Sequence, residues 1–177
     1  TFKILNSLIG LETGVIEDEN FVLTWDSVVR QVPDWNKDQD LKTAFKNSTV
    51  WYYQELARRV GGEQMKYWLD KVNYGNADTS GGIDKFWLSG GLRITPQQQI
   101  DLLKRLRNNT LPFSQRSMDI VKNGENSQFY RAQPGYFGLR ELGITTTSTI
   151  KKSLTYVVAK HKVTDSLNTK QKGDIAE

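Results

Sequence analysis

The chain has 177 residues, of which 37% are hydrophobic and 25% charged, so it carries enough apolar material for one folded domain rather than a disordered chain. No apolar run approaches the roughly 20 residues that cross a bilayer, and the absence of cysteine with a single histidine, His161, excludes a disulfide, a thiolate nucleophile and a Cys- or His-rich metal site. Most of the net charge of +4 lies after Gly143, so the body offers no basic patch for nucleic acid.

The opening segment predicts a buried helix. Its apolar residues recur at helical spacing, and Gly14 follows where a helix would be capped; they are Ile4, Leu5, Leu8 and Ile9. We expect this helix to start at or before Thr1.

A short strand and a loop are predicted next, followed by a helix with an unusual polar position. Phe21 to Trp25 alternates toward a strand, and Pro33 begins a loop. One apolar stripe then runs at positions i, i+3, i+4 and i+7, through Leu41, Ala44, Phe45 and Ser48. Ser48 is read either as a buried serine bonded back to the preceding helical turn or as a functional hydroxyl.

Four more helices are predicted before the chain changes character. Two amphipathic patterns cover 53–60 and 65–72, and a Gly- and Asn-rich loop follows at 74–82. Thr95 with Pro96 predicts the start of a further helix, and Ser114 predicts the N-terminal cap of the last of these four helices. Residues 129–132 are a candidate strand, and 154–159 is the one later apolar run.

Composition shifts near Leu142, because all five tryptophans lie at or before Trp87 and the last stretch is rich in Thr, Ser and Lys. We therefore divide the chain into a domain at 1–140 and a divergent tail at 141–177, which we expect to lie outside the compact core.

Taken singly, each of these positions has a purely structural interpretation. Lys3 is then an exposed lysine, Trp87 an anchor of the core, and Tyr74-Gly75-Asn76 a turn. Taken together and in order, Thr1-Phe2-Lys3, Ser48-Thr49-Val50, Tyr74-Gly75-Asn76 and Phe86-Trp87-Leu88 resemble the motif series of the class D serine β-lactamases. The connecting text at 11–14, 35–37 and 81–85 is similar too, and the resemblance covers 1 to about 140.

The resemblance implies a role for each motif. The family's nucleophilic serine would be the residue before Thr1. Lys3 would be the general base, in the form of a carbamate made with CO2. The resemblance implies no metal and no other cofactor. Ser48 would relay protons, and Trp87 would donate its indole N–H to the carbamate. Substrate-binding positions would be Val50, Trp87, Leu88, Gly135 and Tyr136.

The sequence departs from the family pattern in three places, and one of them is the stretch 143–177, which carries neither the family's Trp-rich strand nor its carboxylate-binding Arg. The serine position falls outside the sequence, from which we expect the chain as given to be inactive. The Lys-Thr-Gly box of the family is matched by Gln133-Pro134-Gly135, where Gln133 lacks the positive charge and Pro134 lacks both the hydroxyl and the backbone N–H.

The implied fold is of the α+β class, the serine β-lactamase and penicillin-binding transpeptidase-like fold, with the all-α lobe mostly present and the antiparallel sheet incomplete. The implied function is hydrolysis of β-lactam antibiotics, the expected partners, through an acyl-enzyme. The alternatives are a β-lactam-sensing penicillin-binding domain and a non-catalytic remnant. Resemblance also implies a periplasmic or secreted protein, and leaves the oligomeric state open.

Overall fold

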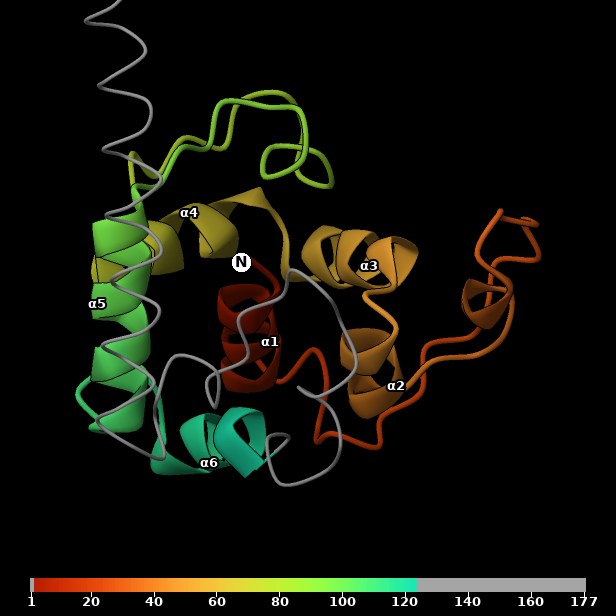
Figure 1. The fold of residues 1–177 in the computed structure, drawn as a ribbon, viewed down its shortest axis with the longest axis horizontal. Helices are drawn as coiled ribbons and strands as arrows, with labels where there is room; N and C mark the ends of the chain where they lie inside the picture. The colour runs from red at the N-terminus through yellow and green to blue at the C-terminus, as the bar shows by residue number, and fades with distance from the viewer. Residues whose placement is uncertain (1, 124–177) are drawn as a thin grey trace, which may run out of the picture. The chain divides into compact units, whose positions relative to one another are not determined.

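The computed structural model describes residues 2–123, which form helices joined by loops (Figure 1). In chain order these are α1 (Phe2–Glu12), the short helix η1 (Pro33–Trp35), α2 (Leu41–Lys46), α3 (Val50–Val60), α4 (Gly62–Val72), α5 (Pro96–Arg107) and α6 (Gln115–Asn123). This arrangement is the expected all-α lobe. The predicted strand at 129–132, the apolar run at 154–159 and the tail at 141–177 lie outside the described residues.

Helix α1 is the centre of this lobe. Ten of its 11 residues are buried, and it packs against both α3 and α6 (Figure 1). Neighbouring elements therefore cover nearly all of α1, and the predicted buried helix is confirmed. Gly10 permits the close approach of α3, because a Cβ there would lie 2.7 Å from the side chain of Leu56.

The ends of the predicted helices follow the expected capping chemistry. Gly14, with φ of 70°, follows the end of α1, as predicted. Thr95 and Gln98 form a reciprocal capping box at the start of α5, in which the Thr95 hydroxyl accepts from the backbone N–H of Gln98 at 3.2 Å. Ser114 accepts the N–H of Ser117 at 3.2 Å and caps α6.

Helix α1 is also tied to α6 through Glu12. Its carboxylate accepts the backbone N–H of Ser114 at 3.0 Å and the hydroxyl of Ser117 at 2.8 Å. An acidic group at a helix N-terminus satisfies free N–H donors and complements the helix dipole. The last residue of α1 therefore supplies a hydrogen-bond acceptor to the N-terminus of α6, about one hundred residues further along the chain.

The strand predicted at Phe21 to Trp25 is wrong. Within residues 2–123 only Leu23 pairs, in an isolated antiparallel bridge with Gln39. The N–H of Trp25, two residues on, would continue this ladder but is bonded at 2.8 Å to the side chain of Asp38 instead of to a backbone carbonyl. Side-chain acceptors compete with ladder pairing here, so the alternating pattern extends no sheet.

The loop at 74–93 is closed by Asn76. Its backbone N–H donates to Arg93 O at 3.0 Å, its side-chain oxygen accepts from Arg93 N–H at 2.8 Å, and its side-chain nitrogen donates to Gly91 O at 2.9 Å. Gly75 precedes this clasp with φ of 58°, and a Cβ at Gly75 would lie 2.0 Å from Arg93 O. Only glycine fits both that backbone conformation and that approach.

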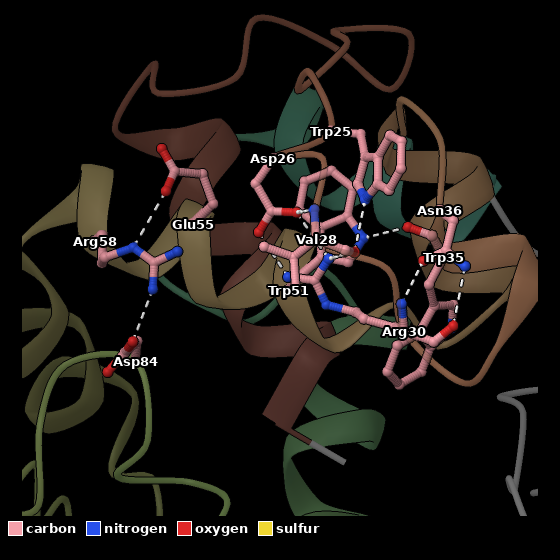
Figure 2. Close-up of polar contacts among 10 residues, drawn as sticks. All are labelled: Trp25, Asp26, Val28, Arg30, Trp35, Asn36, Trp51, Glu55, Arg58 and Asp84. Carbon is pink, nitrogen blue, oxygen red and sulfur yellow. Dashed lines mark hydrogen bonds and ion pairs between the residues drawn. The ribbon is translucent and has the colours of Figure 1, made fainter.

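The same loop is attached to α3 at its far end. Arg58 pairs with the Asp84 carboxylate at 2.7 Å (Figure 2). Gln54 donates to Asp84 O at 3.1 Å. The Trp87 segment is thus fastened on both sides, at Asn76 and at Asp84.

We predict that Gly75→Ala destabilises the fold far more than Gly14→Ala. Both positions have positive φ, so both variants incur about 1 kcal/mol of left-handed backbone cost, but a Cβ at Gly14 would meet nothing within 4 Å. The clash at Gly75 requires the backbone to move, which should add about 2 kcal/mol or more. Urea unfolding of both variants measures the difference, and equal losses would contradict the close approach of Arg93.

Candidate active site

Lys3 lies in the first turn of α1 with 8% of its surface exposed. Its amine donates a hydrogen bond to the hydroxyl of Ser48 and lies 5.4 Å from the centroid of the Tyr53 ring. Burial lowers the pKa of Lys3 to about 8, because an ammonium is poorly solvated there. The interpretation of Lys3 as an exposed lysine is therefore wrong.

Ser48 lies in the turn between α2 and α3, not on the helical stripe we predicted. Helix α2 ends at Lys46, and Ser48 takes a left-handed conformation with φ of 53°. Its N–H donates to Phe45 O at 3.1 Å, which closes the turn and directs the hydroxyl to Lys3 instead of back along α2. The stripe fails at its last position because the helix stops two residues earlier.

The floor beneath Lys3 is built by polar residues that the sequence analysis did not select. The Ser7 hydroxyl donates to Lys3 O at 2.8 Å and lies 3.3 Å from the Tyr53 hydroxyl, and the Asn6 amide donates to Tyr53 O at 3.1 Å. Asn6 and Ser7 are buried. Their signal in the sequence was the spacing of three and four residues from Lys3, which puts these polar groups on one face of an otherwise apolar helix.

Trp87 reaches the site through Phe2, the neighbour of Lys3 in the chain. The two rings stack with centroids 5.1 Å apart and an interplanar angle of 30°. Phe86 is fully buried and meets both rings edge-on. Trp87 is only half-buried, so it lies at the edge of the core and is not fully enclosed in it. Donation of its indole N–H to a carbamate stays a prediction.

The remaining predicted positions fall in different places. Val50 is the half-buried first residue of α3, two residues after Ser48, and Leu88 is 51% exposed beside Trp87. Gly135 and Tyr136, like Gln133, lie outside the described residues. The structure thus brings together Lys3 and Ser48 directly, and Trp87 by way of Phe2.

Within residues 2–123 there is no cluster of His, Asp or Glu able to hold a metal ion, and none of the helices is long and apolar enough to span a membrane. The chemistry available is that of a desolvated amine against a hydroxyl. Such an amine loses its proton more readily than one in water and can then act as a base or as a nucleophile.

We predict that stability depends on pH through Lys3. A lysine whose pKa falls from 10.5 unfolded to about 8 folded destabilises the protein below pH 8, and this cost is relieved as the pH rises toward 10.5. Replacing Lys3 with Met removes the titrating group. The stability advantage of Lys3→Met over the wild type should therefore fall by about 3 kcal/mol across this window. Denaturant melts in CO2-free buffer test this, and a difference that does not vary with pH would contradict it.

A second prediction separates the hydroxyl of Ser48 from its backbone. Ser48→Ala and Ser48→Gly both remove the bond to Lys3, but only Gly relieves the left-handed conformation, so Ser48→Gly should be the more stable by about 1 kcal/mol. The matched pair at Ser89, an exposed residue without positive φ, should show Gly equal to or less stable than Ala. If both pairs rank alike, strain at Ser48 is refuted.

Comparison with known proteins identifies relatives of this chain. The family described as penicillin binding protein transpeptidase domain matches residues 1–173. The probable β-lactamase YbxI of Bacillus subtilis is 48% identical over 122 residues, 69% of this chain and 46% of that protein. The regulatory protein BlaR1 of Bacillus licheniformis is 37% identical over 123 residues, 70% of this chain and 20% of that protein.

Solved structures agree. The crystal structure of the class D β-lactamase YbXI from Nostoc superposes with a TM-score of 0.68 at 52% identity, covering 70% of this chain and 53% of that one. The chain spans about half the length of the β-lactamases it matches.

Proposed function

Since this chain belongs to the class D serine β-lactamases, we propose that its protein hydrolyses β-lactam antibiotics through an acyl-enzyme. The observation that carries the proposal is the contact between a buried Lys3 amine and the Ser48 hydroxyl. In this family the attacking serine stands three residues before the lysine, a spacing that on a helix puts the two side chains one turn apart on the same face. A β-lactam carbonyl held there would face nucleophile, base and proton relay together.

Lys3 is suited to general-base work because its pKa of about 8 leaves a useful fraction of neutral amine near neutral pH. The neutral amine can take the proton of the attacking hydroxyl. Ser48 lies in hydrogen-bond contact and can pass a proton toward the departing β-lactam nitrogen. Burial of the Lys3 side chain, which is 8% exposed, keeps water away from the amine and so maintains its lowered pKa.

Lys3 also fits a carbamate formed with CO2. A buried amine of lowered pKa is the group that adds CO2 most readily, and the Ser48 hydroxyl is a polar partner in contact with the amine. A carbamate supplies an anionic base with two oxygens in place of one nitrogen. Within the described residues, desolvation is the cause of the Lys3 shift and no carboxylate supplies such an oxygen base.

A second candidate is a β-lactam-sensing domain, which would form the acyl group and keep it. The similarity to the regulatory protein BlaR1 favours this alternative. The two functions share Lys3 and Ser48 and differ only in the fate of the acyl group. Under either, the partner is a β-lactam and the location is outside the cytoplasmic membrane.

We predict that penicillin acylates the whole protein and that Lys3→Ala slows acylation by about 10²- to 10⁴-fold, the usual range for a lost general base. Mass spectrometry follows the acyl adduct, and absorbance follows turnover. Lys66→Ala, at an exposed lysine on α4, is the control and should keep the wild-type rate.

The outcomes discriminate among the functions. An adduct that disappears with multiple turnovers supports the enzyme, and an adduct that persists supports the sensor. No adduct at all, in folded protein, refutes both. Degassing followed by bicarbonate should lower and then restore the rate if Lys3 carries a carbamate.

A further inference from the structure

Ser48 is held in place from the loop before α2 by a tryptophan outside the four motifs. The indole N–H of Trp35, the last residue of η1, donates to the carbonyl of Asn47 at 2.8 Å (Figure 2 shows Trp35 and its neighbours). Asn47 is the residue directly before Ser48. The bond therefore fixes the peptide group that enters Ser48.

That peptide group needs a fixed partner, because Ser48 adopts a left-handed conformation. A non-glycine residue keeps such a backbone only where its surroundings determine it. The other side of the turn is fixed separately: Thr49 N–H donates to Ala44 O at 2.8 Å, and the buried Thr49 hydroxyl donates to Gln39 at 3.2 Å. Trp35 and Gln39 thus hold the residues on either side of Ser48.

Trp35 is itself anchored. Its carbonyl accepts the indole N–H of Trp51 at 2.7 Å, and Trp51 lies in the first turn of α3, which follows the Ser48 turn. Gln39 also donates to Asp34 O at 2.9 Å, within η1. These hydrogen bonds connect η1 both to the Ser48 turn and to the start of α3.

We propose that Trp35 is a positioning residue for Ser48: by holding the Asn47 carbonyl, its indole N–H keeps the Ser48 hydroxyl directed at Lys3. The kinetic consequence rests on the proposed function, whereas the structural consequence does not. Trp35→Phe removes the N–H and keeps the aromatic body, so it is the variant to use.

The matched control is Trp25→Phe. Trp25 lies in the same loop, and its indole N–H donates to Val28 O at 3.1 Å, away from the Ser48 turn (Figure 2). Both variants lose one indole hydrogen bond to a backbone carbonyl. Only Trp35→Phe loses one to Asn47.

The structural test is amide hydrogen exchange in the whole protein, followed by NMR. In Trp35→Phe the amides of Ser48 and Thr49 should exchange about five- to tenfold faster, the factor that one such hydrogen bond is worth, while amides of α5 should be unaffected. If α5 amides accelerate equally, Trp35 acts through global stability and the proposal fails. Equal acceleration of Ser48 and Thr49 in Trp25→Phe would also overturn it.

The kinetic test is a double-mutant cycle on the acylation rate with penicillin. Trp35→Phe should slow acylation about tenfold when Ser48 is present and by less than twofold in a Ser48→Ala background, because there is no hydroxyl left to position. An equal loss in both backgrounds would refute positioning through Ser48. Absence of acylation in the wild type would refute the proposed function alone, and the exchange result would still decide the role of Trp35.

Discussion

The removal of the Lys3 amine from water is the interaction on which the rest of the site depends. It follows from the burial of α1, since a helix covered on every side carries its lysine inside with it. Burial of the charged amine opposes folding, and for the same reason it lowers the pKa of Lys3. The site thus obtains a reactive amine by giving up part of the stability that the apolar residues of α1 supply.

The neighbouring groups can be understood as the support that such an amine requires. The Ser7 hydroxyl bonds to the Lys3 carbonyl, the Ser48 hydroxyl accepts a hydrogen bond from the amine, and the Tyr53 ring lies 5.4 Å from the amine. Local strain is concentrated at Ser48, which lies in the turn between α2 and α3 with positive φ and directs its hydroxyl to Lys3. Strained backbone at a functional hydroxyl is common where surrounding contacts overdetermine the conformation.

Much of the helical lobe could be predicted from apolar spacing and capping residues, as at α1 and at Thr95. The motif series likewise selected Lys3 and Ser48, which meet. Periodicity could not reveal that α2 stops before Ser48, because helix ends depend on tertiary hydrogen bonds such as the one Trp35 makes. The polar floor at Asn6 and Ser7 was missed because apolar spacing carries no information about which buried polar groups find partners.

The bond from Glu12 to Ser114 joins residues 102 positions apart. During synthesis the chain emerges from its N-terminal side, so the apolar helix α1 leaves the ribosome long before α3 and α6 exist to cover it. Until then its buried face is open to water and to other chains. Among the helices of residues 2–123, the segment that carries Lys3 is therefore made first and stays open to aggregation and to chaperones until α3 and α6 have been made.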